Sequence, residues 1–199
     1  MECLQQLLEA LEPVVVAAAG DFSQSYEGFS TDTRTVKAGN VFVALSGERF
    51  DGHDFVVGAA EAGAVCAIVE RKVDAAITQI VVTDSGLAFG LAAKAWRGRF
   101  ALPLAVVAGS NGKTTTKELV SRVLAERFEV YATHGNLNNH IGVPLTLLAM
   151  TRDTEFGVVE MGASACGEIA LLASIAEPNY GILTNIGLAH LEGFGGPEG

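Results

Sequence analysis

The chain has 199 residues, of which 49% are hydrophobic and 18% are charged, so it can fill a folded core and is unlike a disordered protein. Its formal net charge of −10 argues against a nucleic-acid-binding surface as the main function, because such surfaces need clustered Lys and Arg. A local basic pocket for a phosphate is not excluded, and the length suits one large domain or two modest ones.

The first half of the chain alternates between helical and strand patterns. In chain order we expect a helix at 2–11, a strand at 41–45, a helix at 54–62, strands at 64–70 and 79–83, and a helix at 86–99. Asp84 or Ser85 is expected to cap the last of these helices. The segment 97–103 combines Gly98, Pro103 and charged residues, and it predicts a boundary between two domains, 1–100 and 101–199.

The second half continues the alternation. We expect strands at 104–109, 129–133, 156–161 and 180–186, and helices at 113–127, 142–150 and 167–176. The strands are nearly all apolar and alternate with helices. This pattern predicts an α/β fold with largely parallel, buried sheets.

The N-terminal segment, the apolar runs and the cysteines together predict where in the cell the protein is found. The N-terminal segment carries Glu2 and Glu9 and no basic region, so it is not a secretory signal, and the longest apolar runs are too short to cross a bilayer. Cys3, Cys66 and Cys166 are odd in number and far apart, which is typical of reduced cytosolic thiols. We therefore predict a cytoplasmic protein.

A glycine-rich turn, GSNGKTT (109–115), joins the strand at 104–109 to the helix that follows. The first N–H groups of a helix are unpaired and carry partial positive charge, and glycines let a ligand approach the backbone, so the turn predicts a phosphate site. Lys113 would then bind the β- and γ-phosphates, and the Thr114 hydroxyl would bind Mg²⁺.

The turn departs from the general phosphate-loop pattern, because Val107 stands where the first glycine of G-x-x-x-x-G-K-[ST] is expected. The alternative is a plain glycine turn with a surface lysine. The order of strand, turn, Lys-Thr-Thr and amphipathic helix favours the phosphate site. The apolar residues that fall on one face of this helix are Leu119, Val120, Val123, Leu124 and Phe128.

The turn is similar to the phosphate loop of the ATP-dependent Mur ligases and their folylpolyglutamate synthase relatives. THGNLNNHIGVPLTLL (133–148), VVEMGASACGEI (158–169) and NIGLAHLEGFG (185–195) extend this resemblance, most closely to the branch that adds D-Ala-D-Ala. STDTRTVKAGNVFVALSGERFDGHDF (30–55) resembles the family's N-terminal UDP-sugar domain. The resemblance implies a small N-terminal α/β domain that binds UDP-MurNAc-peptide at 1–100, and the first part of a central, P-loop-type ATPase domain at 101–199.

The chain departs from the family in one respect: the family's central domain continues well past the position of Gly199, and a third domain of Rossmann type follows it. The family's modified active-site lysine, which helps to hold a second Mg²⁺, also lies beyond that position. By this comparison we expect the chain to be incomplete and not to complete the ligation alone.

The resemblance implies ATP and Mg²⁺ as cofactors and Lys113, Glu160 and His190 as catalytic residues. Thr114, Glu160 and His190 would hold the metal. The residues that would bind ATP are Gly109, Ser110, Asn111, Gly112, Lys113, Thr114, Thr115 and Asn138.

Position in the chain partly supports these roles. Glu160 ends a buried strand, where ligands bind in open α/β sheets, although a salt-bridged structural glutamate is the alternative. Without the resemblance, a lone histidine such as His190 is more often a structural residue than a metal ligand. Thr184 and Asn185 are the alternative candidates for orienting groups at this position. The polar loop residues before 142–150 suit turns in any protein. Within that loop the resemblance favours Thr133 and Asn138 as contacts, and we interpret His134 and His140 as loop residues and Cys166 as inert.

For the substrate, the resemblance implies contacts around the strand at 41–45. The implied contact residues are Thr31, Thr33, Arg34, Glu48, Arg49 and Phe50. Arg34 would either grip a diphosphate or organise its own loop through Asp32.

The implied reaction is amide-bond formation between UDP-MurNAc-tripeptide and D-Ala-D-Ala through an acyl phosphate, with release of ADP. This reaction belongs to peptidoglycan precursor synthesis, and thus to cell-wall biogenesis, cell shape and cell division. Adenylation, which would release AMP, is the alternative activation. A sister ligase, a folylpolyglutamate synthase relative or a non-catalytic nucleotide- or UDP-sugar-binding module are alternative functions. We expect no nucleic acid or membrane partner and a monomeric full-length enzyme.

Overall fold

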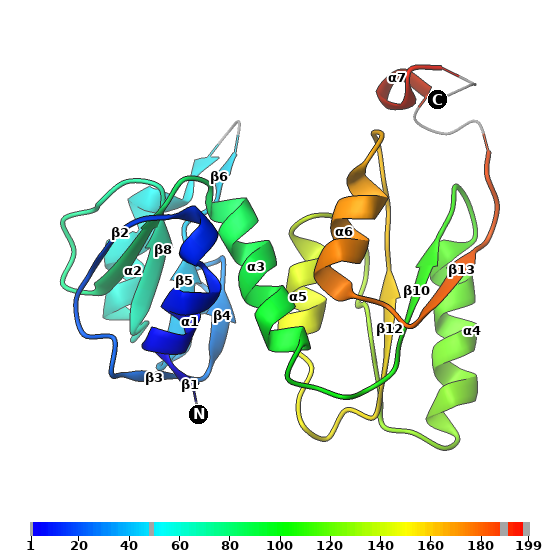
Figure 1. The fold of residues 1–199 in the computed structure, drawn as a ribbon, viewed down its shortest axis with the longest axis horizontal. Coiled ribbons are helices and arrows are strands. Elements are labelled where there is room, and N and C mark those ends of the chain that lie inside the picture. Colours follow the sequence, from blue (N-terminus) through cyan, green and yellow to red (C-terminus); the bar gives the residue numbers. More distant parts are fainter. Residues whose placement is uncertain (1, 48–49, 188–190, 197–199) are drawn as a thin grey trace. The chain divides into compact units, whose positions relative to one another are not determined.

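A computed structural model describes residues 2–47, 50–187 and 191–196 of the chain. Their contacts divide the chain into two compact units, Met1–Ala92 and Ala93–Gly199 (Figure 1). The division falls inside helix α3 (Ser85–Arg97), and each unit is described below by itself. No helix in the described part of the chain has the length and apolar character needed to span a membrane.

The first unit contains a five-stranded sheet in the order β2-β9-β8-β5-β4. Its strands are β2 (Val15–Ala19), β4 (Gly28–Ser30), β5 (Asn40–Val43), β8 (Cys66–Val69) and β9 (Thr78–Val82). All neighbouring pairs are parallel except β2 with β9, which is antiparallel. Strands β5 and β8 are buried along their whole length, as expected for the near-continuous apolar sequence of a parallel strand.

Helices and short elements complete this unit. They are β1 (Glu2–Cys3), α1 (Leu4–Ala10), the 3₁₀ helix η1 (Glu12–Val14), β3 (Ser25–Tyr26), the hairpin β6 (Ser46–Gly47) and β7 (Phe50–Asp51), the 3₁₀ helix η2 (Gly52–Phe55) and α2 (Val56–Glu61). The Asp84 carboxylate accepts the Leu87 N–H at 2.8 Å, so Asp84 caps α3 as predicted. The helix predicted at 2–11 starts two residues late, because Glu2 and Cys3 pair with β3.

The second unit has a parallel sheet in the order β11-β12-β10-β13. Its elements are β10 (Leu104–Ala108), α4 (Lys113–Ala125), β11 (Val130–Ala132), α5 (Gly142–Leu148), β12 (Phe156–Glu160), α6 (Glu168–Ala176), β13 (Tyr180–Leu183) and α7 (Leu191–Phe194). The predicted α/β class with mostly parallel sheets is therefore confirmed.

Alternate residues of the strands face the two sides of this sheet. Leu104, Val106 and Val159 belong to a core with apolar side chains of α5 and α6. Ala105 and Phe156 lie on the other side, beside α4. The period of two in the strands thus places α5 and α6 on one face of the sheet and α4 on the other (Figure 1).

The face of α4 is apolar as predicted, but part of it is exposed. Leu119 and Val123 are 60% and 72% exposed. An open apolar groove of about 490 Å³ is lined by Ala105, Leu119, Val120, Val123, Leu124, Phe156, Tyr180 and Ile182. Helical periodicity correctly indicated which residues share a face, but it does not say how far that face is covered.

Candidate functional site

The phosphate-type loop lies at the carboxyl end of the sheet in the second unit, between β10 and α4. Gly109 and Gly112 both have positive φ, 132° and 79°, and Gly112 is the residue just before α4 begins at Lys113. The unpaired N–H groups of the first helical turn therefore open beside the loop, as an anion site requires.

The segment after β13 braces this loop. The Thr184 hydroxyl donates to the carbonyl of Asn111 at 2.7 Å, and the Asn111 N–H donates to Oδ1 of Asn185 at 3.1 Å. The Ser110 hydroxyl accepts the N–H of Gly187 at 2.8 Å, so this predicted ATP contact is already engaged with the chain. Thr184 and Asn185, predicted as alternative orienting groups beside His190, orient the phosphate-type loop in the structure.

Lys113 is held over the loop that precedes it. Its Nζ donates to the carbonyl oxygen of Gly109 at 2.7 Å and to that of Ser110 at 3.4 Å. Both acceptors are neutral, so the positive charge of the ammonium is not cancelled by them. The loop therefore presents a cation together with helix N–H groups.

Glu160 ends β12 and is 2% exposed. The Thr114 hydroxyl donates to its Oε2 at 2.9 Å, and Nδ2 of Asn138 donates to its Oε1 at 2.8 Å. Among the described residues no Lys, Arg or His forms an ion pair with it. A buried carboxylate that has only neutral partners is costly, so a cation at this position would be stabilising.

These groups fit a hard divalent cation. A carboxylate and a hydroxyl are oxygen ligands of the kind that Mg²⁺ prefers, and Mg²⁺ normally needs few protein ligands because it also binds phosphates and water. Within the described ranges no three His, Cys, Asp or Glu side chains gather as a metal site. The predicted ligand His190 lies outside the described residues.

Two buried side chains support Glu160: Thr133, which directly follows the neighbouring strand β11, and Lys117 of helix α4. Thr133 is 1% exposed, and its hydroxyl accepts the backbone N–H of Glu160 at 2.9 Å. The expectation that Thr133 contacts a ligand is therefore wrong, because its hydroxyl is buried against the strand. Lys117, 2% exposed, donates from Nζ to the Thr133 carbonyl at 2.7 Å. Lys117 is not among the predicted site residues, although a lysine one helical turn after Thr114 is a visible signal in the sequence.

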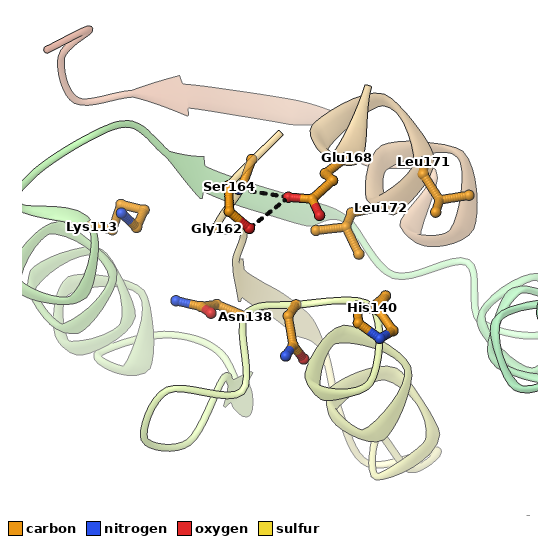
Figure 2. A pocket seen from close by; sticks show the side chains of 10 residues that line it. Lys113, Asn138, His140, Gly162, Ser164, Glu168, Leu171 and Leu172 are labelled. Carbon is orange, nitrogen blue, oxygen red and sulfur yellow. Dashed lines mark hydrogen bonds between the residues drawn. The ribbon is translucent and has the colours of Figure 1, made fainter. Parts of the chain in front are cut away.

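A cavity of about 380 Å³ opens beside Lys113 (Figure 2). It is lined by Lys113, Asn138, Asn139, His140, Gly162, Ala163, Ser164, Glu168, Leu171 and Leu172. His140, predicted to be an ordinary loop residue, is thus part of the wall. Hydrogen bonds from the backbone N–H groups of Ser164 and Ala165 lower the pKa of the Glu168 carboxyl, which is therefore ionised at neutral pH.

The predicted substrate loops lie at the carboxyl edge of the sheet in the first unit. Residues 31–35 follow β4, and residues 44–45 with strand β6 follow β5. These two strands are parallel neighbours, so both segments leave the same edge. Thr31 and Thr33 are half-buried in the first loop. The predicted contacts Glu48 and Arg49 lie outside the described residues, whereas Phe50 is described and 49% exposed.

Arg34 organises its own loop, which was one of the two alternatives considered for it. Its Nε donates to both Asp32 carboxylate oxygens, at 2.9 Å and 3.0 Å. The guanidinium lowers the pKa of Asp32 to about 2. Arg34 is strongly exposed, so its remaining N–H groups stay accessible to an anion.

A buried histidine fixes the second loop. Nδ1 of His53 lies 2.6 Å from Oδ1 of Asp51, and its Nε2 accepts the N–H of Glu70 at 2.8 Å. Arg71 donates to the other Asp51 oxygen at 2.6 Å. A ring that accepts at Nε2 carries a proton on Nδ1, which then faces the Asp51 carboxylate. Sequence analysis did not anticipate this network, because it depends on the pairing of β5 with β8.

Comparison with known proteins assigns both units of the chain to one family. The sequence profile of the Mur ligase family catalytic domain matches residues 25–95, and the profile of the Mur ligase middle domain matches residues 107–199. The chain belongs to the Mur ligase family. The Mur ligase middle-domain match begins inside β10 and includes the phosphate-type loop and Glu160.

Individual Mur ligases resemble the chain over most of its length. The UDP-N-acetylmuramoyl-tripeptide–D-alanyl-D-alanine ligase of Synechocystis sp. is 46% identical over 164 residues, which is 81% of this chain and 36% of the relative. The chain therefore spans little more than a third of that ligase.

Solved structures of Mur ligases also resemble the structure of this chain. The MurF ligase of Thermotoga maritima, in complex with ADP, superposes with a TM-score of 0.77 at 40% identity, covering 83% of this chain and 39% of the ligase. The UDP-N-acetylmuramoylalanyl-D-glutamyl-2,6-diaminopimelate–D-alanyl-D-alanyl ligase of Acinetobacter baumannii superposes with a TM-score of 0.87 at 38% identity, covering 96% of this chain and 43% of that ligase.

Proposed function

We propose that the protein supplies the UDP-sugar unit and the phosphate-binding part of an ATP-dependent ligase that joins UDP-MurNAc-tripeptide to D-Ala-D-Ala. The observation that carries the proposal is the arrangement of Lys113, Thr114 and Glu160 at one edge of the sheet, where a cation, helix N–H groups and a buried carboxylate converge. The names of the Synechocystis and Acinetobacter relatives support these substrates, and the Thermotoga complex with ADP supports an adenine nucleotide as the cosubstrate.

In the reaction we propose, a carboxylate oxygen of the tripeptide attacks the γ-phosphorus of ATP, and the bond to the β-γ bridging oxygen breaks to release ADP. The amine of D-Ala-D-Ala then attacks the acyl carbon of the acyl phosphate, loses a proton and expels phosphate. A carboxylate and a triphosphate repel each other, so positive charge is required at the site. Lys113 and the first N–H groups of α4 supply it.

The remaining residues position these groups. Thr114 and Glu160, with His190 from outside the described residues, would hold Mg²⁺, which when bound neutralises charge on the phosphates. Asn138 fixes the second oxygen of Glu160, and Gly109 and Gly112 let the loop follow a phosphate closely. An enzyme that consumes ATP would work in the cytoplasm, and the three free cysteines agree with that location.

The experiment that tests this proposal replaces Lys113 by alanine. We expect Lys113→Ala to weaken Mg·ATP binding at least tenfold in calorimetry, about 1.4 kcal/mol, because the ammonium group held over the loop is lost. Lys94→Ala, which removes an equal charge from the ion pair with Glu177, should leave the affinity unchanged. Equal ATP affinities in the Lys113 variant and the parent protein would contradict the proposal.

The first unit provides a separate test. UDP-MurNAc-tripeptide at about 100 times its dissociation constant should stabilise the protein by about 2.7 kcal/mol, a rise of roughly 5–10 °C in melting temperature. UDP should stabilise it less. The absence of a shift with either ligand at millimolar concentration would argue against the segments after β4 and β5 as the UDP-sugar site.

The chemistry of the third tripeptide residue matters for the site in the second unit. The name of the Acinetobacter relative contains 2,6-diaminopimelate, a diamino acid, between D-glutamyl and D-alanyl-D-alanyl. We take the third residue of the substrate to be a diamino acid here too. Such a residue carries the carboxylate that reacts and, at the far end of its side chain, an amino group.

A further inference from the structure

The cavity beside Lys113 carries opposite charges on opposite walls. Lys113 is the first residue of α4, whereas Glu168, Leu171 and Leu172 come from α6, and Figure 2 shows the two groups on either side of the space. Between them lie polar side chains of the loop before α5, among them Asn138 and His140. A ligand that fills the cavity therefore meets a cation at one end and an anion at the other, with an apolar wall beside the anion.

The Glu168 carboxylate has one oxygen committed to the chain and one available. Its Oε2 accepts the N–H of Ser164 at 2.6 Å, the N–H of Ala165 at 3.1 Å and the Ser164 hydroxyl at 3.3 Å. Within the described part of the chain, Oε1 accepts no hydrogen bond. The three bonds to Oε2 fix the side chain in place, and the second oxygen is free to accept from a ligand.

The negative charge of Glu168 is not neutralised by an ion pair with a Lys or Arg among the described residues. Its carboxylate is ionised, since the bonds from Ser164 and Ala165 lower its pKa. Leu172 is 2% exposed and Leu171 43% exposed, so one wall of the cavity suits a methylene chain. A primary ammonium on an apolar stem is the group that this wall would select.

We propose that this cavity receives the side chain of the third residue of UDP-MurNAc-tripeptide and that Glu168 binds the ammonium group at its far end. The inference rests on the proposed function and names a specificity-determining residue for it. The reacting carboxylate of that residue must reach the phosphates beside Lys113. Its side chain would then extend along Leu171 and Leu172 towards Glu168.

D-Ala-D-Ala is a weaker fit to the same space. Its single amine must approach the acyl carbon, which forms at the Lys113 end of the cavity. An amine that was bound by Glu168 at the far wall would be held away from that carbon. A diamino acid places one functional group at each end of the cavity.

The test is calorimetry of the 199-residue chain with three ligands: UDP-MurNAc-tripeptide ending in L-lysine, the same compound acetylated on Nε, and UDP-MurNAc-dipeptide. Acetylation removes the positive charge but keeps the stem. We expect acetylation to weaken binding at least tenfold in the parent protein. Glu168→Gln should weaken binding of the lysine form at least tenfold and leave the affinities for the acetylated and dipeptide forms unchanged.

Glutamine is the informative replacement because its carbonyl oxygen still accepts the N–H groups of Ser164 and Ala165. Fluorescence of the single Trp96 and circular dichroism would show whether the variant keeps its fold. Glu126→Gln makes the same charge change at the exposed end of α4 and should bind all three ligands as the parent does.

The outcomes separate the two proposals. If the parent binds the dipeptide form but shows no preference for the free amine, or if Glu168→Gln keeps that preference, the inference about Glu168 is overturned while the proposed function stands. If Glu168→Gln impairs binding of D-Ala-D-Ala instead, the cavity holds the other substrate and the inference is also overturned. If no UDP-linked ligand binds the parent, the proposed function fails and the inference fails with it.

Discussion

Replacement of Gly109 by alanine is expected to destabilise the second unit by about 3–5 kcal/mol. Gly109 has φ 132°, and a Cβ added there would lie 2.2 Å from the Thr184 hydroxyl and 2.9 Å from the Asn185 carbonyl oxygen. Alanine is therefore strained in its backbone and also displaces the hydroxyl that braces Asn111. For a protein of this size the loss corresponds to a fall in melting temperature of roughly 6–20 °C.

Gly112→Ala is the matched control, three residues along the same loop. Gly112 also has positive φ, 79°, but an added Cβ would have no atom within 4 Å. Only the backbone cost of about 1–2 kcal/mol should then appear. Urea unfolding followed by the fluorescence of Trp96, whose indole N–H donates to the Met150 carbonyl within the same unit, measures both variants. Equal losses would show that the contact with Thr184 and Asn185 is unimportant.

The elements that could be predicted from the sequence were those whose pattern is local. Strands β5, β8, β9, β10, β12 and β13 and helices α3 to α6 lie where periodicity and apolar runs placed them, within a few residues. Strand β2 was missed because most of its residues are exposed alanines with no apolar alternation, so its identity comes from pairing with β9. Short pairs such as β1 with β3 depend on contacts far apart in the chain, which a local pattern does not contain.

In the candidate site, too, some features were predictable from local sequence and others depend on the tertiary structure. The positions of Lys113 and Glu160, at a helix start and a strand end, followed from local sequence and are found there. The brace from Thr184 and Asn185 and the support of Glu160 by Lys117 through Thr133 required the order of the strands in the sheet. The wrong expectation for Thr133 has the same origin, since burial of a hydroxyl beside a neighbouring strand is a tertiary property.

Replacement of Glu160 by glutamine should change stability and ligand binding in opposite directions. Without ligand we expect Glu160→Gln to raise the free energy of unfolding by about 1–2 kcal/mol, because a carboxylate only 2% exposed and without a described cationic partner is replaced by a neutral group. Glutamine can still accept from Thr114, and Asn138 can turn its amide to accept from glutamine. The fold around β12 should therefore be kept.

With Mg·ATP the order of the two proteins should reverse. Loss of a metal ligand typically lowers affinity by up to about 100-fold, which is the loss we expect for Glu160→Gln. At about 100 times its dissociation constant the nucleotide stabilises the parent by about 2.7 kcal/mol, whereas a variant that binds 100-fold more weakly gains only about 0.4 kcal/mol. Denaturation curves of both proteins with and without Mg·ATP, beside the exposed control Glu155→Gln, would show this crossing. A variant that is less stable than the parent without ligand would mean that Glu160 acts as a structural carboxylate. The crossing is instead the behaviour of a group kept buried and charged for a cation.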